Sequence, residues 1–190
     1  MISRIHISHK EIKKIKSIRK QQIGFKPRGL WYGINMAWVE WCTSVKFRSF
    51  REDSICYFLE FDATKILHLS TPKEIFEFGK VYRGSPNTWV VNDCCDVYSP
   101  GEKKKAKEWI KNNYCNIDID FIDWKKVAKE YNGIEIWPYQ WKCGHDPKCF
   151  WYYSWDCASG CIWNARIIEK VTPKKFTRRL YNKFKSSTEG

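Results

Sequence analysis

The chain has 190 residues, a formal net charge of +13 and a hydrophobic fraction of 43%. This length suffices for one substantial core and is short for two full domains, so we expect a single domain. Aromatic residues make up 17% of the chain, which excludes a disordered or low-complexity protein. The apolar runs are short and broken by charge, and residues 1–24 lack the apolar block of a signal peptide. We therefore expect a soluble cytoplasmic or nuclear protein that is not secreted and has no membrane partner.

The cysteines and the basic residues each bear on the surroundings of the protein. Nine cysteines form an odd set without the spacing of a closed disulfide framework, which favours reduced thiols. Basic residues crowd both ends of the chain, and such a field attracts polyanions such as nucleic acid. The same charge can also serve solubility alone, so both interpretations stay open. These basic residues are Lys10, Lys13, Lys14, Lys16, Arg19, Lys20, Lys26 and Arg28, then Lys170, Lys174, Lys175, Arg178, Arg179, Lys183 and Lys185.

The first 50 residues predict a strand, a basic segment and a strand-helix unit. Polar and apolar residues alternate in Ser3–Ser8, which indicates a short strand. Isoleucines at near-helical spacing in His9–Ile23 predict a basic helix or an ordered basic loop. Leu30–Tyr32 predicts a second strand, after which Asn35 is placed to cap a helix that continues to Cys42.

The middle of the chain carries clear start and stop signals. Ile55–Leu69 predicts strand in two parts, and Thr71 followed by a proline predicts the start of a helix that ends near Tyr82. Turn residues in Gly84–Gly101 predict a long loop with at most a short strand, and Lys103–Asn112 predicts a helix.

The last third predicts a capped helix, three strands and a basic C-terminal helix. A helix begins near Asp123 and ends before Gly133, where Ile134–Ile136 forms a strand. Phe150–Trp155 and Gly160–Trp163 predict the last strand pair, because aromatic residues favour strands. Beyond Pro173, the spacing of Phe176, Leu180 and Phe184 predicts a basic amphipathic helix.

Five segments resemble one protein family. Pro27–Met36, running on into Trp41 and Cys42, resembles the Gly-Ile-Tyr-Phe strand-and-helix segment of ADP-ribosyltransferases of the poly-ADP-ribose polymerase type. His6-Ile7-Ser8 is similar to the His-Gly-Ser or His-Gly-Thr of that family's first strand. Tyr57–Leu69, followed by the helix from Thr71, resembles the strand-helix unit of small bacterial and phage ADP-ribosyltransferases, and Tyr131–Ile136 resembles their Tyr-Asp-Gly-Ile turn. Cys161–Ile168 resembles the strand that follows the family's catalytic glutamate.

The resemblance implies a fold and a cofactor site. It implies one α+β domain over residues 1–172, in which two small antiparallel sheets flanked by helices form an NAD cleft, with a basic amphipathic helix and tail over residues 173–190. NAD would be the substrate. The residues that would bind it are His6 and Ser8 at the nicotinamide ribose, Trp31 as the counterpart of the tyrosine in the family's His-Tyr-Glu triad, its neighbour Tyr32, and Trp41 as a ring that stacks on nicotinamide.

The catalytic group departs from the family's pattern. Cleavage of the bond between ribose and nicotinamide builds oxocarbenium charge, which a carboxylate must stabilise. In the register of the resemblance Ser159 stands where the family has glutamate, and the nearest acids are Asp156 and Glu135. These three residues are the candidate catalytic groups. Glu135 points away from its isoleucine neighbours, toward solvent or a cleft, and Asp156 equally fits the cap of a turn.

A cluster of cysteines offers a separate hypothesis. Cys143, His145, Cys149, Cys157 and Cys161 are of the residue types that bind structural zinc. Their spacing contains neither a Cys-x-x-Cys pair nor a His-x-x-x-His pair, and cysteine often serves as a small apolar residue in strands. We therefore expect no zinc.

Together these observations predict an ADP-ribosyltransferase-like protein that transfers ADP-ribose from NAD to a macromolecule, either protein or nucleic acid. Two alternatives stay open. One is a non-enzymatic basic aromatic module that binds nucleic acid, and the other is a viral or phage factor that occupies an acidic surface of a host protein.

Overall fold

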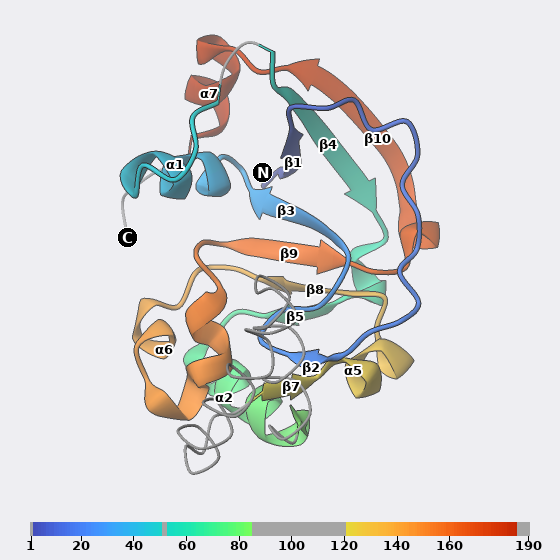
Figure 1. Cartoon of the computed structure of the whole chain (residues 1–190), viewed down its shortest axis with the longest axis vertical. Helices are drawn as coiled ribbons and strands as arrows, with labels where there is room; N and C mark the ends of the chain where they lie inside the picture. The colour runs from blue at the N-terminus through green and yellow to red at the C-terminus, as the bar shows by residue number, and fades with distance from the viewer. Residues whose placement is uncertain (1, 51–52, 85–120, 186–190) are drawn as a thin grey trace, which may run out of the picture.

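A computed structural model describes residues 2–50, 53–84 and 121–185 of the chain. A twisted seven-stranded mixed sheet forms its centre, with a three-stranded antiparallel sheet at one end (Figure 1). Helices and strands alternate irregularly, which confirms the expected α+β class. The large sheet consists, in spatial order, of β10 (Ile168–Lys175), β4 (Ile55–Phe61), β1 (Arg4–Ser8), β3 (Leu30–Ile34), β9 (Ser159–Ile162), β8 (Gly133–Ile136) and β5 (Leu67–Leu69).

The resemblance implies two small antiparallel sheets, but one of the two sheets is large and mixed. In the large sheet β5 and β8 pair in parallel, and the other neighbouring strands pair antiparallel. The small sheet consists of β2 (Ile23–Gly24), β7 (Phe121–Asp123) and β6 (Arg83–Gly84). The α-helices are α1 (Ala37–Ser44), α2 (Pro72–Val81), α5 (Trp124–Glu130), α6 (Trp141–Gly144) and α7 (Arg178–Phe184). The 3-10 helices are η1 (Ala63–Lys65), η3 (Pro147–Ser154) and η4 (Ala165–Ile167).

Local signals in the sequence explain several of these elements. Thr71 and Glu74 form a reciprocal capping box at the start of α2, with Pro72 in its first turn. The carboxylate of Asp123 caps α5 by accepting a hydrogen bond from the backbone of Lys125. These helices begin where the sequence predicts them.

Helices cover one face of the large sheet. Alternate residues of a strand point to opposite faces, and the side of β1 with Ile5 and Ile7 packs against Met36 and Val39 beside α1. On the same face, farther along the sheet, a second core contains Ile134 of β8 together with the rings of α2, α5 and η3. Figure 1 shows α1 and α7 beside the β10–β1 half of the sheet, and α2 and α6 beside the β9–β5 half.

Three expectations at the level of elements are wrong. Asn35 does not cap α1: it adopts a left-handed φ of 54°, and its side chain accepts a hydrogen bond from the backbone of Ser3. Phe150–Trp155 is not a strand, because Asp146 caps the segment and Pro147 starts it as the 3-10 helix η3. The C-terminal segment of residues 173–190 does not begin as a helix: β10 continues through Pro173 to Lys175, and α7 begins at Arg178. A proline is possible in β10 because this strand lies at the edge of the sheet.

Other expectations have a simpler outcome. The segment from residue 11 to residue 22 has no regular structure, so the loop alternative applies and the helical one does not. The long loop beyond Gly84 and the helix Lys103–Asn112 lie outside the described residues. The six cysteines within the described ranges are all free and buried. Among those ranges no helix is long and apolar enough to span a membrane.

Candidate functional site

A pocket of about 310 Å³ opens on the helix-covered side of the large sheet, where β1 and β3 separate. Residues from β1, β3, β9, α1 and the segment after η3 surround it, and the three-stranded sheet contributes none. The pocket therefore lies on one sheet and not between two. Its lining residues are Ile5, His6, Ile7, Lys26, Trp31, Tyr32, Gly33, Trp38, Arg48, Trp155, Asp156, Cys157 and Ser159.

The separation of β1 from β3 places the His6 side chain. The two strands pair at Arg4 with Ile34 and at Ile5 with Gly33, and the pairing ends there. Beyond that point the Nδ1 of His6 lies 2.6 Å from the carbonyl oxygen of Trp31. A carbonyl oxygen only accepts hydrogen bonds, so Nδ1 carries the proton. Burial lowers the pKa of His6, and the hydrogen bond to Trp31 offsets this only in part, so the neutral imidazole keeps Nε2 as its acceptor nitrogen.

Two indole rings form an aromatic wall. Trp31 and Trp155 meet edge to face, with ring centroids 5.0 Å apart and planes at 63°. Trp155 is fully buried, while Trp31 is half-buried beside the pocket. The ammonium of Lys26 lies 5.5 Å from the centroid of the Trp31 ring. Trp31 therefore supplies the ring surface of this wall, Trp155 supports it from the core, and Lys26 adds one positive charge.

Asp156 supplies a carboxylate at the pocket. The Nζ of Lys26 lies 3.0 Å from its Oδ2, and the two side chains are 39% and 26% exposed. The pair is therefore accessible from the pocket, unlike a core ion pair. Lys26 and Asp156 are 130 residues apart in the sequence. Their contact fixes the carboxylate beside the aromatic wall.

Ser159 and Cys157 close the floor near β9. The Ser159 hydroxyl donates a hydrogen bond of 2.9 Å to the Cys157 carbonyl, and Ser159 is buried at 7% exposure. Ser159 thus orders the turn before β9. Burial, and secondarily the charge of Asp156, raises the pKa of the Cys157 thiol to about 12, which keeps it protonated.

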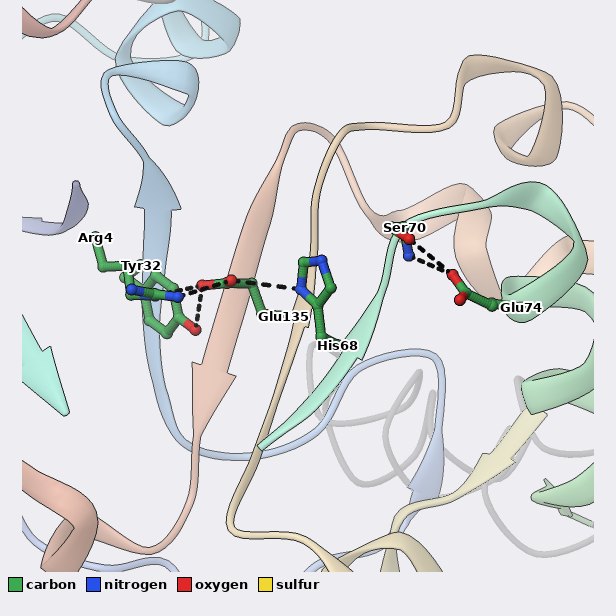
Figure 2. A network of polar contacts seen from close by, with 6 residues as sticks. All are labelled: Arg4, Tyr32, His68, Ser70, Glu74 and Glu135. Carbon is green, nitrogen blue, oxygen red and sulfur yellow. Dashed lines mark hydrogen bonds and ion pairs between the residues drawn. The ribbon is translucent and has the colours of Figure 1, made fainter. Parts of the chain in front are cut away.

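Glu135 is not part of the pocket, contrary to its candidacy as a catalytic group. It is 2% exposed, so the expectation that it faces solvent or a cleft is also wrong. Figure 2 shows its carboxylate between Arg4, Tyr32 and His68. Arg4 donates to both oxygens at 2.6 and 3.1 Å, Tyr32 donates at 3.0 Å, and Nδ1 of His68 lies 3.5 Å away. A carboxylate with these partners holds the sheet together.

Two of the residues expected to bind NAD also lie outside the lining. The Ser8 hydroxyl donates to the backbone carbonyl of Lys10 and accepts from its N–H, which closes a local turn. Trp41 stacks on Trp38 at 5.1 Å and 17°, so it contacts a lining residue without reaching the pocket. Of the expected site residues, His6, Trp31, Tyr32, Asp156 and Ser159 line the pocket, but the Tyr32 hydroxyl lies on the other face of the sheet, where it donates to Glu135.

Four polar or aromatic lining residues were not among the sequence candidates: Lys26, Trp38, Arg48 and Trp155. Trp155 directly precedes Asp156, and Lys26 directly precedes the motif that begins at Pro27. Their position next to these candidates could have marked them as site residues. Trp38 and Arg48 had no such signal in the sequence, because their positions depend on how α1 packs against β3. This packing is close: a Cβ at Gly33 would lie 3.2 Å from the Cβ of Trp38.

The cysteine cluster does not assemble. Within the described ranges no group of three or more His, Cys, Asp or Glu side chains could hold a metal ion. Cys143 lies at α6, whereas Cys161 lies in the middle of β9, where burial raises its pKa well above the ordinary value.

Comparisons with known proteins add no information about the pocket. Comparison with models of known protein families, with curated proteins and with solved structures finds no significant match to this chain.

Proposed function

We propose that the pocket binds NAD and that the protein is an ADP-ribosyltransferase-like enzyme that transfers ADP-ribose to a macromolecular acceptor. One observation carries this proposal: residues named from the sequence as NAD-binding or catalytic candidates, drawn from three distant parts of the chain, line a single pocket. They are His6 and Trp31 as NAD-binding candidates and Asp156 as the catalytic candidate.

The pocket has the size and the chemistry for one end of the dinucleotide. Its volume of about 310 Å³ lies at the lower end of small-molecule sites, so it takes part of NAD and leaves the rest outside. The half-buried indole of Trp31, supported from the core by Trp155, suits the nicotinamide ring. Lys26 and Arg48 supply positive charge at the same pocket for the phosphates.

Asp156 takes the role of the missing glutamate in this proposal. When the bond between ribose C1′ and the nicotinamide nitrogen breaks, its electron pair leaves with neutral nicotinamide and the ribose becomes positively charged. The Asp156 carboxylate stabilises that charge electrostatically. A nucleophilic atom of the acceptor then forms the new bond to C1′ and releases its proton to solvent. Ser159 bonds to a backbone carbonyl and has no part in this step.

The test uses NAD labelled in its adenine half, with mixed protein and RNA as acceptors. We expect transfer of label and release of nicotinamide, and Asp156→Asn to slow both by about 100-fold, the size of effect seen when one charge-stabilising group is lost. His6→Ala should weaken the thermal stabilisation by NAD. The matched control is Glu60→Gln, which also removes a carboxylate 3.0 Å from a lysine ammonium but on the outer strands. Unchanged NAD together with no thermal shift would overturn the proposal.

A further inference from the structure

Three rings form an exposed aromatic surface next to the pocket, here called the aromatic platform. It consists of Trp38 and Trp41 on α1 and Phe47 after it. Trp38 and Trp41 stack, and Phe47 lies 5.7 Å from Trp41 and 6.3 Å from Trp38 between ring centroids. Phe47 is 62% exposed, and the two indoles are half-buried.

The platform is not required by the core. The core beneath α1 is filled by Val39 and Cys42, which are 4% and 0% exposed. The three rings pack against one another and leave apolar area at the surface. An exposed aromatic group of this kind is typical of a binding surface.

Positive charge accompanies the rings. The guanidinium of Arg48 lies 6.0 Å from the Phe47 ring centroid, and Lys46 is exposed beside it. Arg48 and Trp38 also line the pocket, so the platform and the pocket are continuous. The carboxylate at this junction, Asp156, is paired with Lys26.

We propose that the aromatic platform binds a single-stranded nucleic acid, which is the acceptor of the ADP-ribose; the acceptor role rests on the proposed function, while the binding does not. Unpaired bases stack on rings such as Trp41 and Phe47, and the phosphates lie against Arg48 and Lys46. Because Trp38 belongs to both surfaces, a strand on the platform presents its next nucleotide to the pocket.

Single strands fit these features better than the other polyanions do. The bases of a duplex are already stacked on each other, so the rings reach only the bases at its ends. An acidic peptide would satisfy Arg48 but has no flat ring to cover Phe47. Stacked rings with adjacent cations are the combination that proteins use for single strands.

The test measures binding of fluorescent 12-nucleotide single strands of RNA and of DNA by anisotropy, without NAD. We expect Phe47→Ala and Trp41→Ala each to weaken binding by about 5- to 100-fold, the range for loss of one base-stacking ring. Arg48→Gln should reduce the salt dependence by about one phosphate contact. The RNA and DNA arms decide which of the two strands is preferred.

Controls separate this proposal from the previous one. Trp141 is 67% exposed on α6, outside the pocket lining and away from α1 (Figure 1), so Trp141→Ala should leave oligonucleotide affinity unchanged. His6→Ala should keep oligonucleotide affinity even if NAD fails to bind. Equal affinity for a duplex or for polyglutamate, or equal affinity of Phe47→Ala and the native protein, would overturn the platform proposal. Thermal melting confirms that each variant is folded.

Discussion

Arg4 on β1 and Glu135 on β8 form a two-point ion pair although β3 and β9 lie between their strands in the sheet. Tyr32, Gly160 and Glu135 face each other in one row across β3, β9 and β8. Gly160 has no side chain, so the Tyr32 ring lies over it and reaches Glu135. The pair therefore joins the two halves of the sheet over a gap that a glycine leaves.

Loss of the Glu135 charge should destabilise the fold without removing a reacting group. Burial alone would lower the pKa of Arg4, but its bond and attraction to Glu135 raise it, so the two groups depend on each other. We expect Glu135→Gln to lower the free energy of unfolding by about 3 kcal/mol, because it leaves a half-buried cation without its partner. Urea denaturation measures this. A variant with native stability and no transferase activity would instead indicate that Glu135 is catalytic.

Gly160→Ala should be destabilising for a steric reason. A Cβ at this position would overlap the Tyr32 hydroxyl oxygen and lie 2.8 Å from the Ile134 carbonyl oxygen. We expect a loss of about 2 kcal/mol in urea denaturation, the size of an overpacking effect. Gly144→Ala is the control, since its nearest atom is a Tyr139 hydroxyl at 3.1 Å. Equal stability of the two variants would contradict the close packing of Tyr32 on β9.

Features that depend on neighbouring residues could be predicted from the sequence. The capping box of α2, the cap of α5 and the alternation of β1 each involve only a few neighbouring residues, so the sequence alone shows their patterns. The prediction at Phe150–Trp155 failed because aromatic strand propensity was weighed above the Asp146-Pro147 start signal that forms η3.

Features that depend on distant partners could not be predicted. Glu135 can be buried because Arg4, 131 residues away in the sequence, neutralises its charge. No residue near Glu135 in the sequence indicates that Arg4 is its partner. Asp156 acquires Lys26 in the same way. The resemblance nevertheless brought together residues that share the pocket, since its motifs follow the strands that line it.

The capping box should make a measurable contribution to stability. The Thr71 hydroxyl accepts a hydrogen bond from the backbone of Glu74 at 3.2 Å. Thr71→Ala should therefore reduce the free energy of unfolding by about 1 kcal/mol. Thr71→Ser retains the hydroxyl and should stay close to the native protein in the same denaturation experiment. Equal losses in both variants would show that the methyl group, and not the cap, matters.

The other half of the box predicts a dependence on pH. Hydrogen bonds from Ser70, then from Thr71, lower the pKa of Glu74 from 4.5 to about 2 (Figure 2). The folded state thus favours the ionised carboxylate, so the contribution is complete above pH 4.5 and is lost as the pH falls toward about 2. Glu74→Gln should show a flatter decline of melting temperature over this window. Parallel curves for the two proteins would contradict the box.

Lys26 should act as a positioning residue for Asp156. Lys26→Met keeps an apolar chain beside Trp31 but removes the 3.0 Å contact that holds the carboxylate. We expect turnover of NAD to fall about tenfold, which corresponds to about 1.4 kcal/mol of transition-state stabilisation. Lys26→Arg should retain most of the activity, because a guanidinium can still bond the carboxylate. If Lys26 served only to bind phosphate, Lys26→Met would raise KM and leave kcat unchanged, so the split between the two constants decides its role.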